Sequence, residues 1–195
     1  LNVLSEFYFK QREYDHAFDV KKDGSESGRI NINDWLTFAN ECRKENQYKI
    51  SIEAYNFILG QKINSNWVGK ALLGLAQTFE DQIIPSQESH LIPYFFDNNL
   101  FFEDPFQLNS TLSSEHLESS LALYDSLLIS LPKSPLLAEA YFRLSEIKYR
   151  ILHDFDQAYN LLHKAMQNKP DKRLRLKIVL RIADVLMAKG QSEEA

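Results

Sequence analysis

Apolar and small residues recur along this chain in matching segments that lie about 34 residues apart. Ala17 and Ser51 are one such step apart, at equivalent places in two of these segments. The matching segments are 12–20, 46–55, 115–128, 154–166 and the short 189–195. A repeat of this length is typical of helical hairpins that stack side by side, rather than of a chain folded around one closed core.

The first helix of each predicted hairpin carries one small residue. These are Ser5, Ala39, Ala76, Ser145 and Ala183. An apolar residue precedes each of them, and a large apolar residue lies four positions earlier. Because offsets of three and four residues share one helix face, each first helix is predicted to bury a stripe around its small residue.

The second helices carry small residues that match those of the first. Ala17, Ser51 and Ala195 each lie twelve positions after the small residue of the first helix. Ala158 lies thirteen positions after Ser145, and Ser120 follows Ala76 only after the insertion described below. Small residues let two helix backbones approach closely, and large neighbours fill the remaining space. The predicted helices are 2–10, 13–22, 32–45, 48–60, 66–82, 114–130, 135–152, 155–168 and 172–189.

Several residues mark helix ends. Ser134 followed by Pro135 predicts an N-cap with proline at the first helical position. Asp154 and Asp171 are predicted to cap the next two helices. Gly24 and Gly28, in the segment DGSESG, predict a flexible link after the first hairpin.

These stripes resemble those of the tetratricopeptide repeat (TPR) family over nearly the whole chain except residues about 83–112. The segment 132–170 is similar to repeats of bacterial envelope proteins in its Pro-x-Ser-x-x-x-x-Glu-Ala-x-x-x-Leu opening. The resemblance implies one all-α domain over residues 1–195, a right-handed α-solenoid of about five hairpins. It also favours a periplasmic or cell-envelope location over the cytoplasm.

In TPR proteins the first helices line a concave groove that binds peptides. The resemblance therefore implies these groove residues: Leu36, Asn40, Arg43, Lys44, Leu73, Gln77, Glu80, Glu139, Phe142, Glu146, Tyr149, Arg150, Lys177, Leu180, Asp184 and Met187. Chaperone-binding members have a basic clamp for a C-terminal carboxylate, but this chain has apolar residues where the clamp needs lysine. The groove is thus interpreted as mixed apolar and charged, suited to an amphipathic helix or an extended segment.

The third hairpin is predicted to contain an insertion of about 32 residues, around 83–112. Its aromatic residues are Tyr94, Phe95, Phe96, Phe101, Phe102 and Phe106. Because large apolar groups tend to be buried, we favour packing of these rings on the solenoid, with a short helix near 91–102. A partner-binding patch is the alternative. Glu103 and Asp104, without a basic flank, argue against a membrane-surface anchor.

Composition and motifs limit the ligands and reactions that this chain can support. A net charge of −5 disfavours a general nucleic-acid binder. The single cysteine, Cys42, excludes an internal disulfide and a cysteine-based zinc site, and the five histidines are scattered singly. No phosphate-binding glycine motif or nucleophile elbow is present, and no apolar run is long enough for a membrane span. We therefore expect no catalysis, metal, cofactor or membrane insertion within these residues.

The basic segment 169–177 is interpreted as a solvated helix start with Leu174 and Leu176 facing inward, and contact with an acidic partner is the alternative.

The expected function is a scaffold or adaptor that binds a protein or peptide. Two alternatives remain open: a homo-oligomer built through the terminal hairpins or the insertion, and a solenoid that accompanies a catalytic domain outside these residues. Because the chain starts at Leu1 and ends at Ala195 inside a predicted helix, we expect it to be a fragment of a longer protein.

Overall fold

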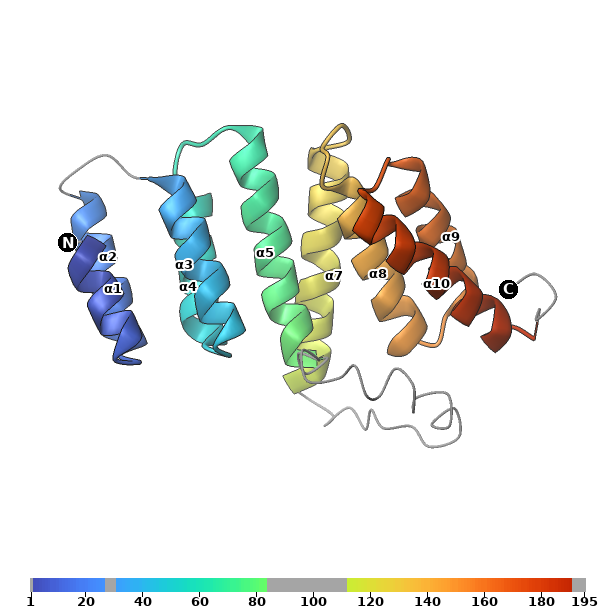
Figure 1. The fold of residues 1–195 in the computed structure, drawn as a ribbon, viewed down its shortest axis with the longest axis horizontal. Helices are drawn as coiled ribbons and strands as arrows, with labels where there is room; N and C mark the ends of the chain where they lie inside the picture. Colours follow the sequence, from blue (N-terminus) through green and yellow to red (C-terminus); the bar gives the residue numbers. More distant parts are fainter. Residues whose placement is uncertain (1, 27–30, 84–111, 191–195) are drawn as a thin grey trace. The chain divides into compact units, whose positions relative to one another are not determined.

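The computed structural model describes residues 2–26, 31–83 and 112–190, and the regular structure in these ranges is entirely α-helical (Figure 1). The helices are α1 (Asn2–Lys10), α2 (Tyr14–Glu26), α3 (Ile32–Lys44), α4 (Tyr48–Leu59), α5 (Ser65–Ile83), α7 (Leu112–Ser130), α8 (Leu137–Arg150), α9 (Phe155–Gln167) and α10 (Lys172–Ala188). The predicted all-α class is confirmed for these residues. The aromatic residues of the insertion, from Tyr94 to Phe106, lie outside them.

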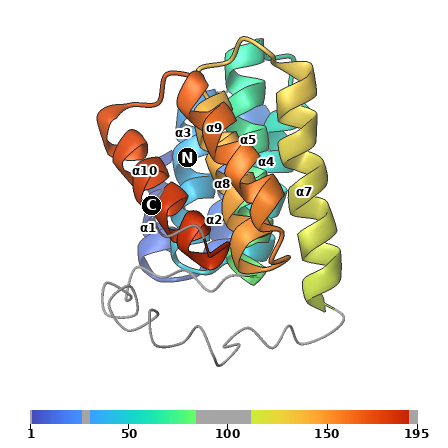
Figure 2. The same ribbon diagram turned by 90° about the vertical axis from the view of Figure 1, so that its right-hand side faces the viewer.

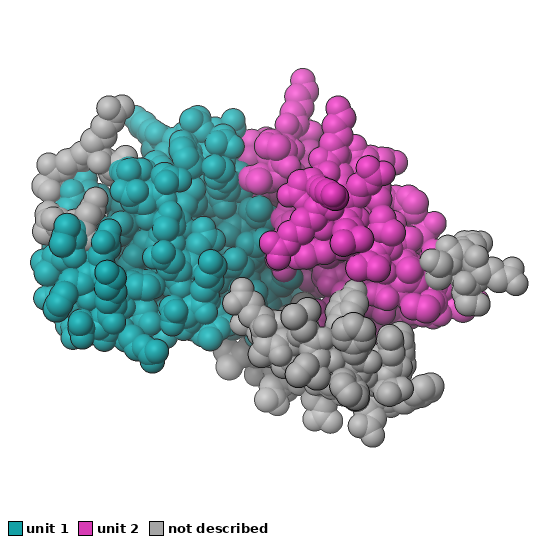
Figure 3. All heavy atoms as spheres, in the orientation of Figure 1, with its two compact units in different colours: residues 1–86, 113–120 teal, residues 87–112, 121–195 magenta. Residues whose placement is uncertain are grey.

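The chain divides into two compact units, which Figure 3 shows in different colours. Among the described residues, the first unit contains α1 to α5 and the start of α7, up to residue 120. The second unit contains the rest of α7 and helices α8 to α10.

In the first unit, α1 packs against α2 and α3 packs against α4, each pair joined by a short turn (Figure 1). Helix α5 packs against both α3 and α4, and α2 also contacts α4. Neighbouring hairpins therefore share contacts, as expected when a single hairpin cannot bury its apolar face alone.

The predicted small residues lie where the two helices of a hairpin cross. In the first hairpin the Ser5 hydroxyl donates a hydrogen bond of 2.7 Å to the carbonyl of Ala17. In the second hairpin the Ser51 hydroxyl donates one of 2.9 Å to the carbonyl of Ala39. All four residues are buried. The small side chains thus bring the backbones close enough for a serine of one helix to bond the other.

The same bond recurs between α5 and the start of α7, although a long segment separates them in the sequence. The Ser120 hydroxyl donates to the carbonyl of Ala76 at 3.1 Å, across 44 positions of the chain. The rings of Phe79 and His116 also lie 5.8 Å apart. Helix α5 and the first turns of α7 therefore pair as the predicted third hairpin.

Aromatic residues from four helices, α1 to α4, pack together in the core of the first unit. Trp35 is buried, and its ring lies 4.3 Å from that of Phe57 and 5.6 Å from that of Phe18, between centroids. Phe9 of α1 contacts Phe38 of α3 with a centroid distance of 5.8 Å. Burying rings of this size stabilises the packing of each hairpin on the next.

In the second unit, α8 and α9 form a hairpin and α10 packs against both (Figure 2). Its core includes Phe142 of α8, Leu162 of α9 and Ile178 of α10. Ala158 is buried at the helix crossing, as predicted. The Ser145 hydroxyl differs from the earlier serines, because it donates to the Phe142 carbonyl of its own helix.

The turns between helices use left-handed backbone conformations. Arg12 and Asn46 occupy equivalent places in the first two turns, with φ of 64° and 59°. His153, where the repeat gains one residue, has φ of 50°, and Lys169 has φ of 54°. A residue of this conformation after a helix C-terminus redirects the chain into the next helix.

Two of the predicted helix starts are confirmed. The Asp154 carboxylate accepts a hydrogen bond from the Gln157 N–H at 3.0 Å, and the Asp171 carboxylate accepts one from the Leu174 N–H at 2.8 Å. Such caps satisfy N–H groups that have no partner inside the helix.

Ser134 and Gly24 were interpreted wrongly, whereas Gly28 lies outside the described residues. Helix α8 begins at Leu137, after a turn in which the Ser134 hydroxyl accepts the Leu136 N–H at 3.2 Å. Helix α2 continues through Gly24 to Glu26, because Ser25 fixes its last turn. The Ser25 hydroxyl donates to the Lys21 carbonyl and accepts from the indole N–H of Trp35, both at 2.9 Å.

The prediction that Leu176 faces inward was also wrong. It is 62% exposed, whereas Leu174 packs against the core and Ile178 is fully buried. The buried face of α10 therefore runs through positions 174 and 178, and 176 lies on the opposite side of the helix.

Candidate functional site

A groove of about 280 Å³ lies between α3 and α5 in the first unit. Its lining residues are Asn33, Leu36, Thr37, Asn40, Lys70, Leu73, Gly74 and Gln77. Four of them, Leu36, Asn40, Leu73 and Gln77, are residues that the sequence predicted to face a groove. The structure brings these four together.

The two walls of the groove come from equivalent positions of two repeats. On α3, residues 33, 36, 37 and 40 lie on one helix face, since they are separated by three or four positions. On α5, residues 70, 73, 74 and 77 have the same spacing and the same offsets from the small residue Ala76 that the first set has from Ala39. Asn33, Thr37, Lys70 and Gly74 were missed in the sequence, although this offset rule would have found them.

Gly74 allows the side chain of Tyr55 to pass beneath the groove. A Cβ atom at position 74 would lie only 2.3 to 2.5 Å from ring atoms and the hydroxyl of Tyr55. Tyr55 itself is fully buried, and burial raises the pKa of its phenol to about 12. No other residue type fits at position 74 without displacing this ring.

Tyr55 holds the Asn40 amide in a defined orientation. Its hydroxyl donates a hydrogen bond of 2.8 Å to Asn40 Oδ1, while Asn40 Nδ2 donates one of 2.8 Å to the carbonyl of Leu36. A side-chain amide can form about four hydrogen bonds. Two of these four are made here, so the Asn40 amide retains capacity for a ligand in the groove.

Gln77 faces Asn40 from the other wall. The residue is only 9% exposed, and its side chain lines the groove. Among the described residues, the buried side-chain polar atom without a hydrogen-bond partner is Arg43 Nε, so the Gln77 amide is not buried without a partner. Gln77 therefore places a polar amide at the surface of the groove, opposite Asn40.

Lys70 is the one ionisable residue among those that line the groove. It is exposed, and its ammonium group lies 4.6 Å from the centroid of the Trp67 ring. This contact holds a positive charge at the N-terminal end of α5 without neutralising it.

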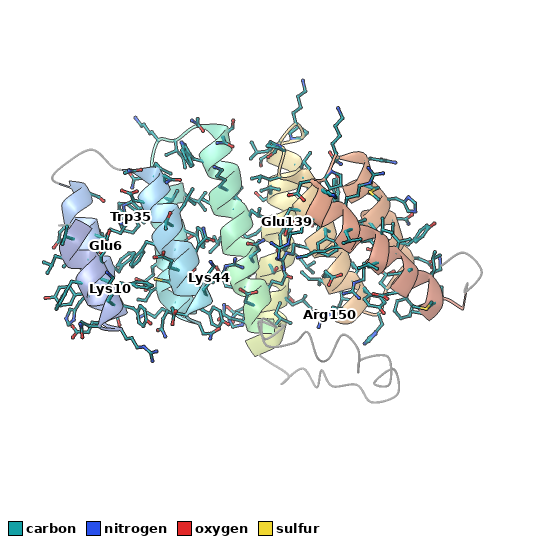
Figure 4. All side chains as sticks on the ribbon, in the orientation of Figure 1. Glu6, Lys10, Trp35, Lys44, Glu139 and Arg150 are labelled. Carbon is teal, nitrogen blue, oxygen red and sulfur yellow. The ribbon has the colours of Figure 1, made fainter. Side chains whose placement is uncertain are left out.

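Arg43, Lys44 and Glu80 do not line this groove. Arg43 Nη1 lies 3.1 Å from a carboxylate oxygen of Asp81, which links α3 to α5 beyond the groove. Glu80 is buried, whereas Lys44 is exposed at the C-terminal end of α3, the end opposite Trp35 (Figure 4). The predicted binding role of these three residues therefore gains no support from the groove.

In the second unit, the equivalent positions of α8 and α10 hold an ion-pair network. The Arg181 guanidinium donates two hydrogen bonds to the Glu146 carboxylate, at 2.5 and 3.0 Å, and one of 2.8 Å to Asp184. It also lies 5.0 Å from the centroid of the Tyr149 ring. Burial raises the pKa of Tyr149, and the nearby Arg181 opposes that shift.

Four predicted groove residues of the second unit are thus engaged within the protein. Phe142 belongs to the core, while Glu146, Tyr149 and Asp184 surround Arg181. Arg150 lies at the C-terminal end of α8, and Glu139 near its start (Figure 4). The open groove of the first unit, with neutral side chains at these positions, is the better candidate site.

The described residues give little support to a metal site, a reactive cysteine or a membrane-spanning helix. They contain no group of three or more histidine, cysteine, aspartate or glutamate residues arranged to hold a metal ion. Cys42 is fully buried, and burial raises the pKa of its thiol to about 12, far above the range of reactive cysteines. None of the described helices combines the length and the apolar character needed to cross a membrane.

No model of a known protein family matches the chain, and no curated protein matches its sequence significantly.

Proposed function

We propose that this chain is a non-catalytic scaffold of the TPR type, a right-handed solenoid of about five hairpins, which binds a peptide segment of a partner protein in the α3–α5 groove. The recurrence of one serine-to-carbonyl bond at three helix crossings supports a repeated architecture. The single observation that carries the binding role is the groove itself, in which the amides of Asn40 and Gln77 lie on opposite walls at equivalent positions of two repeats.

The chemistry of the groove favours a main chain as ligand. Asn40 and Gln77 offer amide donors and acceptors from opposite walls, which match the alternating N–H and C=O groups of an extended peptide. Leu36 and Leu73 supply apolar surface for one side chain of the ligand.

The size and charge of the groove limit which peptide segments it can bind. A volume of about 280 Å³ lies near the lower end of the range for small-molecule pockets, about 300–1,000 Å³. It suits one or two residues of a longer segment that continues along the helices. Lys70 favours an acidic group at the N-terminal end of α5, so the preferred segment combines an apolar residue with an acidic neighbour.

Selection from a random peptide library, followed by calorimetric titration, tests this proposal. We expect Gln77→Ala and Asn40→Ala each to weaken binding of the selected peptides about tenfold, since each removes hydrogen bonds inside a desolvated groove. Gln167→Ala and Asn56→Ala remove the same groups at exposed positions elsewhere and should leave the affinity unchanged.

Recovery of no peptide, or of peptides whose affinity is the same for all four variants, would contradict the proposal.

A further inference from the structure

An ion pair joins the two walls of the α3–α5 groove one helical turn beyond its polar residues. Arg43 lies three positions after Asn40 on α3. Asp81 lies four positions after Gln77 on α5. Arg43 Nη1 lies 3.1 Å from Asp81 Oδ2, and the two side chains are only 17% and 18% exposed. Such a shielded pair is screened by salt much less than one at the open surface, so it can hold the two helices together.

The Arg43 guanidinium is not fully satisfied in this place. Its Nε atom is buried and has no hydrogen-bond partner among the described residues. Leaving a buried donor unpaired costs free energy, and an apolar side chain of similar size would avoid that cost. The stability of the fold alone therefore does not account for an arginine at position 43, whereas a bond that sets the separation of α3 and α5 does.

Tyr55 of α4 acts on the same two helices in the opposite sense. Its ring occupies the space beside Gly74 on α5, and its hydroxyl donates a hydrogen bond of 2.8 Å to Asn40 on α3. The ring keeps α3 and α5 from moving closer, while the Arg43–Asp81 pair keeps them from moving apart. Because α3 and α5 belong to different hairpins, no turn joins them directly, and these side chains help to define the width of the groove.

We propose that Arg43 is a positioning residue for the groove: through Asp81 it holds α3 and α5 at the separation at which the amides on both walls bond to one peptide. This role rests on the proposed peptide-binding function. Hydrogen bonds require donor–acceptor distances within a range of about half an ångström, so two amides on opposite walls reach one ligand only at a narrow range of groove widths. Without the ion pair the chain spends part of its time in wider forms, and the apparent Kd rises as the binding-competent form becomes less populated.

Calorimetric titration with a peptide selected on the unmodified chain tests this role. Arg43→Met retains most of the side-chain length but not the charge, and we expect the Kd to rise about fivefold. Arg43→Lys retains the charge and lacks the unpaired Nε–H, so we expect its Kd to stay within about twofold of that of the unmodified chain. Arg143→Met is the matched control, since it breaks an arginine–carboxylate pair of 3.0 Å within α8 of the second unit, and its Kd should not change.

A measurement without peptide separates positioning from stability. Nitroxide labels on Glu41→Cys and Asn66→Cys, at exposed positions of α3 and α5 that do not line the groove, report the separation of the two helices by pulsed electron paramagnetic resonance. The native Cys42 is fully buried, which protects it from the label. We expect Arg43→Met to broaden the distribution of distances toward longer values, and the selected peptide to narrow it again. Arg43→Lys should keep the distribution of the unmodified chain.

Asp81→Asn removes the charge of the pair from the other wall, and it replaces Arg43→Met in both measurements if that variant loses its helical circular dichroism. If no peptide binds the unmodified chain, the proposed function fails and the positioning role fails with it. If the peptide binds but Arg43→Met changes neither the Kd nor the distances, only the positioning role is overturned. Equal weakening by Arg43→Lys and Arg43→Met would also overturn it, since the charge would then not matter.

Discussion

Gly74, Tyr55 and Asn40 link the core of the first unit to the surface of the groove. The Tyr55 ring fills the space that a side chain at position 74 would need, and its hydroxyl bonds to the Asn40 amide. Because a buried side chain fixes the polar group that faces the groove, Asn40 requires little reorganisation to bind. Such pre-organisation lowers the entropic cost of association.

The contact between Gly74 and Tyr55 predicts a large effect of one methyl group. Gly74→Ala should lower the free energy of unfolding by about 1–3 kcal/mol, since the new Cβ forces the Tyr55 ring or α5 to shift. Gly60→Ala is the matched control, because a Cβ there meets only carbonyl oxygens at 3.5 Å in an ordinary helical conformation. Urea unfolding of both variants measures the difference, and equal stabilities would refute the close contact.

Ionisation of Tyr55 predicts a loss of stability at high pH. Folding raises its pKa from 10.0 to about 12 because burial disfavours the phenolate, so its contribution is complete below pH 10 and is lost as the pH rises toward 12. By pH 11 the unmodified chain should lose about 1.4 kcal/mol more than Tyr55→Phe, which cannot ionise. Urea unfolding of both proteins at pH 9 and pH 11 gives this comparison, and parallel losses would argue against a buried phenol.

At the level of helices, α8 and α10 carry charged residues at the positions where α3 and α5 carry the neutral groove residues. Where the first unit has Asn40 and Gln77, the second has Glu146 and Asp184, with Arg181 bonded to both carboxylates. These side chains satisfy one another, so they stabilise helix packing and are not available to a ligand in the same way.

Removing the arginine from this network should be costly. Arg181→Met leaves the buried Glu146 carboxylate without its bidentate partner, and we expect the free energy of unfolding to fall by about 3 kcal/mol. Asp156→Ala breaks an ion pair in which the aspartate side chain is 82% exposed, and it should change stability by less than about 0.5 kcal/mol. If thermal or urea unfolding gave similar values for both variants, Arg181 would hold no buried charge in place.

The helices themselves could be predicted from local signals. Asp154 and Asp171 cap their helices as expected, because the cap needs only a carboxylate and an N–H three residues later. Ser134 and Gly24 misled for different reasons. The turn after Ser134 postpones α8, and the tertiary bond from Trp35 to Ser25 extends α2 through a glycine that would otherwise end it.

At the level of the whole molecule, the spacing of small residues fixed which positions share a face. The resemblance to TPR repeats led to the prediction of Leu36, Asn40, Leu73 and Gln77, which meet in the groove. It could not show that Glu146 is taken up by Arg181, since a bond across 35 positions depends on how two helices pack. The fold class and half of the groove residues were thus predictable. Whether each groove side chain is open to a ligand or already bonded within the protein was not.

The central claim is that repeat-equivalent faces of α3 and α5 form a groove in which the amides of Asn40 and Gln77 bind a peptide. Nuclear magnetic resonance of the labelled chain, titrated with a peptide selected from the library, tests this most directly. We expect the side-chain amide signals of Gln77 and Asn40 to shift most, together with backbone signals of α3 and α5, and the Gln167 amide to stay in place. Shifts confined to residues outside α3 and α5, with the Gln77 amide unmoved, would contradict the account.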